Sequence, residues 1–573
     1  MQFIKSLFKL LFFICPAFAT AQSTFLTPGS KDVHFVDRLE IKQQRNTHLN
    51  FSAVRPFNRK YIVEQVEFID SARLGYIDLN TQKDKYIEWN SQALTDLDEY
   101  NLTSFLMNNS EWVTGPKKDF LSKRPVLKTF YKTKPNFLEV KTNNFFLAVN
   151  PVFQYYMGVE TGYNKPIYLN SKGITARGTI GKKIGFSTYM TDNQERGPQF
   201  FQQQVTNSRA VHGVGFYKPF KTSGYDYFDA RGYITVRAGN AVDVQFGYDK
   251  NFIGNGYRSL FLSDWGNSNL FLKLNTRIWK INYQNLFMEL MPQFKKAGDT
   301  LLDRKYAAMH HLSVNVTRWL NIGLFEGVIF GRKNRFDFQY LNPIIFYRHI
   351  EGTVGSPDNA IAGFDFKANI AHRAQLYGQF LLDEFVLSEI RKNNGSWVNK
   401  WGIQLGVKYI DAFGVDNLDI QLEANRVRPF TYTHNDTISN YTHYNQPLAH
   451  PLGANFQEVM AIIRYQPAKK WHVYLHGMYY YRGLDSANAN FGGNVFRDYS
   501  TRTKNDGFSI GSGNKQTVLN TYLQVSYEIR ENVFFEVTGL YRREKTLLNP
   551  VAKSTTMFTG GVRINMFNRR YDY

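Results

Sequence analysis

The chain has 573 residues and a formal net charge of +21, and its composition is 16% aromatic and 20% charged. Its mean hydropathy is -0.40, and beyond residue 21 no stretch approaches about 18 consecutive apolar residues, which excludes a bundle of transmembrane helices. The aromatic content excludes a disordered chain. The only cysteine is Cys15, so a disulfide scaffold or a thiolate metal site is not expected.

Residues 1–21 have the pattern of a secretory signal peptide. Lys5 and Lys9 precede an apolar run that ends at the small residues 19–21, and we expect cleavage after this site. The residues before Cys15 are too large for a lipoprotein signal, so no lipid anchor is expected. The remaining basic chain suits contact with anionic glycans or lipopolysaccharide phosphates, whereas export disfavours nucleic acid.

Residues 22–145 are predicted to form a small helical domain. Helical spacing of apolar residues covers Asp32 to Gln44, Arg59 to Ala72, and a third segment from Gln82 to Asn109. All three segments are too polar to cross a membrane.

From about residue 146 to residue 573 the sequence alternates apolar and polar residues in runs of about ten. Leu422 and Ala424 alternate with Glu423 and Asn425, which predicts one face toward lipid and one toward a wet lumen. The predicted strands lie near 152–160, 173–181, 183–190, 228–237, 241–248, 269–276, 278–288, 307–316, 319–329, 361–371, 374–384, 401–410, 417–427, 457–466, 471–482, 518–528, 532–543 and 556–567.

The links between these strands are expected to alternate strictly between short and long. Outer-membrane barrels show this rhythm, with short periplasmic turns and long outer loops. The sequence therefore predicts a closed antiparallel outer-membrane β-barrel of about 18 strands. The helical residues 22–145 would lie in the periplasm, either as a separate small domain or packed into the barrel mouth.

The last predicted strand ends with Gly561 to Phe567, a glycine followed by alternating apolar residues and an aromatic. This pattern is typical of a terminal strand that the barrel-assembly machinery recognises. In the alternative interpretation it is an ordinary last strand followed by a polar tail, residues 568–573.

Several long segments resemble the Wzi-type capsule-assembly outer-membrane proteins, in the form found in bacteria of the Bacteroides and Flavobacterium type. These segments are His34 to Ile41, Arg55 to Lys60, Phe145 to Gln154, Gly247 to Trp265, Tyr340 to Phe366 and Arg426 to Glu458. The resemblance implies an eighteen-stranded barrel with a periplasmic helical bundle, which attaches capsular polysaccharide without catalysis. The gliding-motility protein RemB is also similar, so a role in motility or adhesion stays open.

Two long loops combine aromatic rings, which stack on sugar faces, with cations that would hold acidic sugars. The candidate glycan-binding residues are Arg426, Arg428, Tyr432, His434, Tyr444, Tyr257, Arg258 and Trp265. The expected ligand is an anionic surface polysaccharide or lipopolysaccharide, and capsule-export or motility components are further candidate partners. In the alternative interpretation these aromatics pack the loops into a plug and the cations face lipopolysaccharide phosphates.

Other chemistry finds little support in the sequence. His434, His443 and His450 have spacings that match no compact metal site, and no cofactor is expected. A serine–histidine lipid hydrolase stays open because His472 and His476 face the predicted lumen. A diffusion porin is the main alternative function, favoured by polar lumen residues. One of them is Glu423, which would tolerate replacement by Gln.

Overall fold

The structure is a computed structural model. It describes residues 23–44, 49–73, 94–115, 120–123, 125–181, 183–293, 301–333, 335–344, 346–355, 358–384 and 386–573. The predicted signal peptide and residues 82–93 of the third predicted helix lie outside the described residues.

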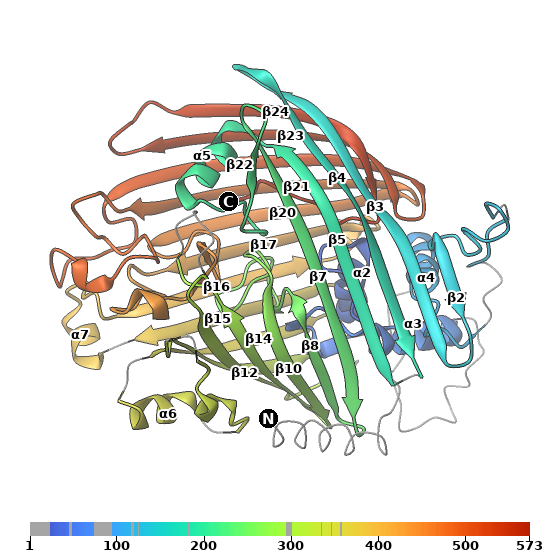
Figure 1. The fold of residues 1–573 in the computed structure, drawn as a ribbon, viewed down its shortest axis with the longest axis horizontal. Coiled ribbons are helices and arrows are strands. Elements are labelled where there is room, and N and C mark those ends of the chain that lie inside the picture. The colour runs from blue at the N-terminus through green and yellow to red at the C-terminus, as the bar shows by residue number, and fades with distance from the viewer. Residues whose placement is uncertain are drawn as a thin grey trace.

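Eighteen antiparallel strands form one closed barrel (Figure 1). In chain order they are β3 (Phe145–Glu160), β4 (Tyr163–Ile180), β5 (Ile184–Arg196), β7 (Gly224–Ala238), β8 (Val242–Asp249), β10 (Asn269–Ile278), β11 (Ile281–Leu290), β12 (Lys305–Asn315), β13 (Leu320–Phe330), β14 (Asn359–Ile370), β15 (Ala374–Glu384), β16 (Lys400–Tyr409), β17 (Leu418–Val427), β20 (Phe456–Ala468), β21 (Trp471–Leu484), β22 (Asn514–Arg530), β23 (Val533–Thr546) and β24 (Lys553–Ile564). The predicted fold class is confirmed.

The ring closes where β24 pairs antiparallel with β3, with Ile564 opposite Phe153. Along strands such as β16, β17 and β23, more exposed and buried residues alternate, as period-two geometry requires. β12 is an exception, since it is buried on both faces over most of its length. In β17 the side chain of Leu422 is 48% exposed on the outer face, whereas Glu423 is 1% exposed in the lumen. The faces that the sequence assigned to this strand are therefore confirmed.

The first hairpin departs from the predicted alternation of links. β3 begins at Phe145 rather than near 152 and ends at Glu160. β4 begins at Tyr163 rather than near 173, so only two residues join the two strands. The sequence interpretation took the polar residues before 173 for a loop. Ile167 and Leu169 in this stretch are buried, and their inward packing extends the strand.

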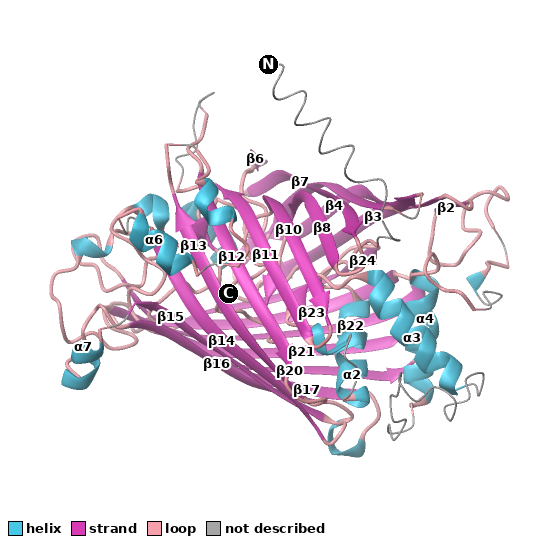
Figure 2. Cartoon of the chain, turned by 90° about the horizontal axis from the view of Figure 1, so that it is seen from below, coloured by secondary structure: helices cyan, strands magenta, loops and turns pink. Residues whose placement is uncertain are grey.

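Three helices fill the end of the barrel where the short turns lie, which we call the short-turn end (Figures 1 and 2). They are α2 (Lys31–Gln43), α3 (Arg59–Arg73) and α4 (Asp96–Asn108). A shared core of buried side chains, including Val36, Val66 and Phe105, packs the helices together. These helices form the N-terminal plug, and the first two agree with the predicted ranges.

The loops at the opposite, long-loop end carry most of the remaining short elements. Those in the long loops are α5 (Gln199–Ser208), α6 (Tyr347–Thr353), α7 (Leu387–Lys392), the 3-10 helices η4 (Phe338–Leu341), η6 (Thr437–Ser439) and η7 (Tyr499–Thr501), and the strands β6 (Lys218–Phe220), β9 (Phe252–Ile253), β18 (Thr442–His443) and β19 (Gln446–Pro447). Elsewhere in the chain, η1 (Leu49–Phe51) and β1 (Val54–Arg55) precede α3, β2 (Leu138–Lys141) precedes β3, and η5 (Ala412–Gly414) lies between β16 and β17. None of the described helices is long and apolar enough to cross a membrane.

Two long loops fold inward from the long-loop end. β9, in the loop after β8, pairs inside the barrel with β1 of the N-terminal segment, with Val54 opposite Ile253. In the loop after β17, the hydroxyls of Tyr432 and Tyr441 donate to the carbonyl oxygens of Leu260 and Phe261 at 2.8 and 2.7 Å. The segments 250–265 and 428–455 therefore form a second body in the lumen, the loop plug.

The chain end also lies inside the barrel, where the C label falls within the ring of strands in both views (Figures 1 and 2). Tyr571, Asp572 and Tyr573 are buried. The Tyr571 hydroxyl donates to Glu195 at 2.6 Å, and the Arg542 guanidinium donates to the Tyr573 carbonyl oxygen at 2.9 Å. The polar tail after the last strand is thus a lumenal segment.

Candidate functional site

The eight candidate glycan-binding residues fall into three places in the structure. Tyr257, Arg258 and Trp265 lie in the loop plug and line a chamber in the lumen. Arg428, Tyr432, His434 and Tyr444 lie in the inward-folded loop after β17. Arg426 is exposed on the outer face of the barrel wall, where its guanidinium lies over the Trp401 ring. One common site does not contain all eight.

Arg428 and Tyr432 hold the loop plug together. The Arg428 guanidinium donates to the carbonyl oxygens of Asn399 and Ser396 at 2.8 and 3.1 Å. Tyr432 is 2% exposed. The polar groups of both side chains therefore donate hydrogen bonds to backbone carbonyls. This agrees with the alternative interpretation that the loop aromatics pack a plug.

His434 belongs to a cluster of rings and cations near the tips of three loops, which we call the outer cluster. The Trp397 and Tyr499 rings are 4.7 Å apart, and the Arg502 guanidinium lies 3.8 Å over the Trp397 ring. The His434 ring meets Tyr499 at 6.0 Å. Trp397, Tyr499 and Arg502 were missed from the sequence because they come from two loops that are far apart in the chain and meet only in the fold.

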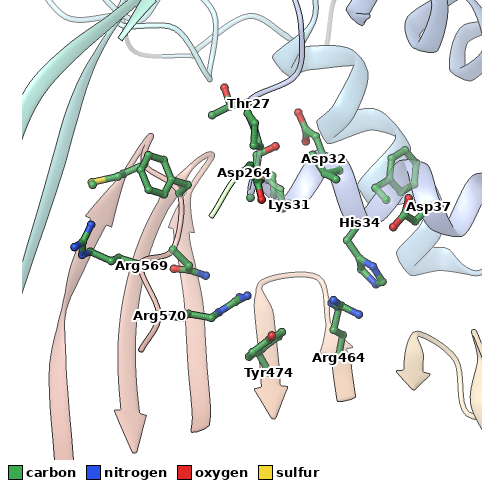
Figure 3. A pocket seen from close by; sticks show the side chains of 18 of the residues that line it. Thr27, Lys31, Asp32, His34, Asp37, Asp264, Arg464, Tyr474, Arg569 and Arg570 are labelled. Atoms are coloured by element: carbon green, nitrogen blue, oxygen red, sulfur yellow. The ribbon is translucent and has the colours of Figure 1, made fainter. Parts of the chain in front are cut away.

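The lumenal chamber lies between the two plugs and has a volume of about 580 Å³, within the usual range for ligand pockets. Its wall contains residues of α2, the loop plug, the C-terminal tail and strands β20 and β21 (Figure 3). Thirteen lysines and arginines line it, against five aspartates, so the chamber favours anions.

Many of the chamber cations are neutralised by carboxylates. Lys408 pairs with Asp37 at 3.0 Å, Arg563 with Glu536 at 2.7 Å and Arg569 with Glu195 at 3.0 Å. The Arg258 guanidinium donates to the Asp572 carbonyl oxygen of the tail. Such pairs are structural, since a buried charge is costly without its partner.

Burial shifts the pKa of loop residues at the chamber. Burial, together with nearby Arg231, lowers the pKa of Lys250 to about 7, against the opposing effect of Asp229 and Asp264. Burial also lowers the pKa of His212 to about 3, so this ring is neutral and packs against Trp265 and Tyr573. Among the described residues, no group of three metal-ligating side chains is arranged to hold an ion.

The C-terminal tail is the part of the chamber that sequence reasoning missed. Residues 568–573 read as a polar end beyond the last strand, yet Arg569, Arg570, Asp572 and Tyr573 line the chamber. The alternation of tyrosines and charges in this stretch was a signal, because aromatic residues are rarely left in a solvated tail.

Comparison with known proteins identifies the family. The sequence profile of the family described as capsule assembly protein Wzi matches residues 185–556. The chain belongs to this family. It is an outer-membrane β-barrel protein. No curated protein sequence matches it significantly.

Solved structures show the same architecture. The chain is similar to Wzi from Escherichia coli, an outer-membrane protein involved in group 1 capsule assembly and described as a carbohydrate-binding β-barrel. The identity is 14%, the TM-score is 0.55, and the match covers 95% of this chain and 99% of that chain. OprD from Pseudomonas aeruginosa is 11% identical with a TM-score of 0.41, covering 73% of this chain and 94% of that chain.

Proposed function

We propose that this protein assembles or anchors an acidic polysaccharide at the cell surface without catalysing a reaction. The observation that carries the proposal is the match to the capsule-assembly family across the barrel and its long loops. The outer cluster supports it, because Trp397 and Tyr499 offer rings for sugar faces and Arg502 offers a cation that pairs with no carboxylate among the described residues. The strongly basic chain suits an acidic glycan.

A double substitution in the outer cluster tests this role. A deletion strain complemented with Trp397→Ala plus Tyr499→Ala should shed glycan into the medium at unchanged barrel abundance. Phe346→Ala is the matched control, since Phe346 is 76% exposed on another long loop and no ring or cation contact is found for it in the described part of the chain. Normal capsule staining of the deletion strain itself would contradict the proposed function, and normal retention in the double variant would remove the outer cluster from it.

We infer that the short-turn end, with the helical residues 22–145, faces the periplasm, since outer-membrane barrels keep their short turns there. Exposed residues allow a labelling test. Tags at Asn435 and Asn488 should be labelled on intact cells, and tags at Asp416 and Lys469 only after the outer membrane is opened. Labelling of all four on intact cells would contradict this orientation.

Diffusion through the barrel is a weaker proposal, because the N-terminal plug, the loop plug and the C-terminal tail lie across the lumen. We expect no steady conductance of the purified protein in planar bilayers. A role in gliding or adhesion would follow from surface glycan anchoring, and scoring the deletion strain for spreading tests it.

A further inference from the structure

Three arginines of the chamber wall, Arg59, Arg464 and Arg570, have no carboxylate within ion-pair distance among the described residues. Arg59 donates instead to the Phe25 carbonyl oxygen at 2.9 Å and to the Asn109 side chain. Arg464 of β20 donates to the Gln421 side chain at 3.1 Å, and Arg570 of the tail has a buried Nε without a hydrogen-bond acceptor. Figure 3 shows both side chains beside Tyr474 of β21.

Both guanidiniums lie against the ring of Tyr474. The Arg570 guanidinium carbon lies 3.7 Å from the centre of the Tyr474 ring, and the Arg464 guanidinium carbon lies 5.7 Å from it. Arg464 and Tyr474 are directly opposite in the β20–β21 pair, so their lumenal side chains are neighbours. The ring thus provides cation–π contacts for both charges.

The carboxylates nearest in the structure are already engaged. Asp419 is opposite Arg464 in the neighbouring strand, but it accepts from His34 at 2.7 Å and from Arg38. Asp572, two residues after Arg570, accepts from Tyr257 and pairs with Arg258 at 3.6 Å. Two guanidiniums that contact the same ring, neither within ion-pair distance of a carboxylate among the described residues, can each donate to an anionic group, and the guanidinium fork matches the geometry of a carboxylate.

Two other chamber carboxylates, Asp264 and Asp32, also lie beyond ion-pair distance of Arg464 and Arg570. Asp264 interacts electrostatically with Lys250 and raises its pKa. Asp32 interacts electrostatically with Lys31 and Arg59, which lower its own pKa. Burial raises the pKa of Asp32 to about 6, so this carboxyl stays mostly ionised near neutral pH. Neither has an ion-pair partner among the described residues.

The rest of the chamber wall suits sugar hydroxyls. Amide and hydroxyl side chains, which carry donors and acceptors, also line the chamber. They include Asn101, Asn108, Asn532, Gln466, Gln524 and Ser526. The volume of about 580 Å³ is large for a single ion and suits a short oligosaccharide.

We propose that the lumenal chamber is a second glycan site, in which Arg464 and Arg570 bind the carboxylate of an acidic oligosaccharide. The inference rests on the proposed function for the class of ligand, an acidic glycan, and on the chamber geometry for its place. The site is separate from the outer cluster, since its residues belong to β20, β21 and the C-terminal tail.

Calorimetry on the full chain purified in detergent tests this site with trigalacturonate as the probe. Maltotriose supplies a neutral sugar of the same length, and inorganic phosphate supplies an anion without a sugar. Trigalacturonate should bind and maltotriose should not. The variant Arg464→Gln plus Arg570→Gln should bind about tenfold more weakly or worse, because hydrogen bonds to charged groups contribute roughly that factor or more.

Arg426→Gln is the matched control, because Arg426 is an exposed arginine on the outer face and its loss should leave the affinity unchanged. Arg464→Lys keeps the charge and the fold but loses the bidentate geometry, so an intermediate loss is expected. Heat-modifiable migration in gels confirms that each variant is folded.

Three results would overturn the inference. The first is an unchanged affinity for trigalacturonate in the double glutamine variant. The second is equal binding of phosphate and trigalacturonate, which would mean a simple anion site. The third is no binding of trigalacturonate by the unmodified protein. The outer-cluster strains test surface anchoring independently, so failure of the chamber site leaves the proposed function standing and failure of retention does not affect the chamber result.

Discussion

The two plugs that fill the barrel are held by different chemistry. In the N-terminal plug, Arg38 pairs with Asp98 and Asp411 at 2.9 Å each and with Asp419, and Lys42 pairs with Asp411 at 2.9 Å. In the loop plug, tyrosine hydroxyls and Arg428 donate to backbone carbonyls, and rings pack against one another. The N-terminal plug is held mainly by ion pairs. The loop plug is held mainly by hydrogen bonds and apolar contact, to which Arg258 adds an ion pair with Asp572 at 3.6 Å.

Arginines inside the barrel differ in the same way, because some have carboxylate partners and others do not. Arg38 has carboxylates on several sides, so its position is overdetermined and its role is to hold α2 in the barrel mouth. Arg464 and Arg570 face the same chamber without such partners. A charge that the protein leaves unneutralised in a concave site marks a place for an external counter-charge.

Removing Arg38 is expected to have the largest effect. Arg38→Ala leaves the buried Asp419 carboxylate without its guanidinium and leaves Asp98 and Asp411 with Lys42 alone. Loss of one partner from a buried pair costs about 3–5 kcal/mol. The N-terminal plug should then become sensitive to protease in the purified barrel. Arg464→Gln serves as the control and should leave the plug resistant. Equal sensitivity of the two variants would remove the distinction between paired and unpaired arginines.

Both plugs lie on the lumenal face of the barrel wall, and the pattern of β17 indicates that the other face meets lipid. Leu422→Arg places a charge on the outer face, at a cost of about 2–4 kcal/mol near mid-membrane. The yield of the variant in the outer membrane should fall well below that of Leu422→Ala, which removes only apolar contact. Equal yields would mean that this residue does not face lipid.

The wall was predictable from the sequence because its signal is local. Each strand repeats with a period of two, and the wall separates two environments that select opposite residues. All eighteen strands were located in this way, and errors arose at their ends, as in β4, where inward-facing Ile167 and Leu169 extend the strand into a predicted loop.

The plugs were not predictable in the same way because their contacts join distant parts of the chain. Arg38 meets Asp419 across 381 residues, and Tyr432 meets Leu260 across 172 residues. No local period records such pairs. The same limit applies to the chamber, where Arg464 and Arg570 are brought together by the inward course of the tail.

Glu423 illustrates this limit and provides the third test. As a lumen-facing charge it was expected to tolerate replacement by Gln, yet it accepts from the backbone N–H groups of Tyr257 and Arg258 at 2.7 and 3.1 Å and from the Tyr377 hydroxyl at 2.8 Å. Glu423→Gln places an amide donor against these donors, at a cost of about 1–3 kcal/mol.

The expected result of Glu423→Gln is faster amide hydrogen exchange in segment 250–265, with the N-terminal plug unaffected. Tyr377→Phe removes one donor and keeps both backbone anchors, so it should have a smaller effect on the same segment. Unchanged exchange in 250–265 would mean that the loop plug does not depend on this carboxylate, and it would restore the expectation from the sequence.

The smallest expected effect is a pH dependence of trigalacturonate affinity in the chamber. Lys250 has a pKa of about 7, lowered chiefly by burial, so it is protonated at pH 6 and largely neutral at pH 8. The arginines stay charged throughout, and the carboxylates of the sugar stay ionised. Affinity should therefore fall as pH rises, by the roughly 0.2–1 kcal/mol that a partly solvated ion pair contributes.

Lys250→Gln should flatten the profile measured by calorimetry between pH 6 and pH 8, whereas any contribution of the chamber histidines would persist in that variant. An affinity that rises with pH, or an equal slope in Lys250→Gln, would show that Lys250 does not act on the bound anion and would confine the site to the two arginines.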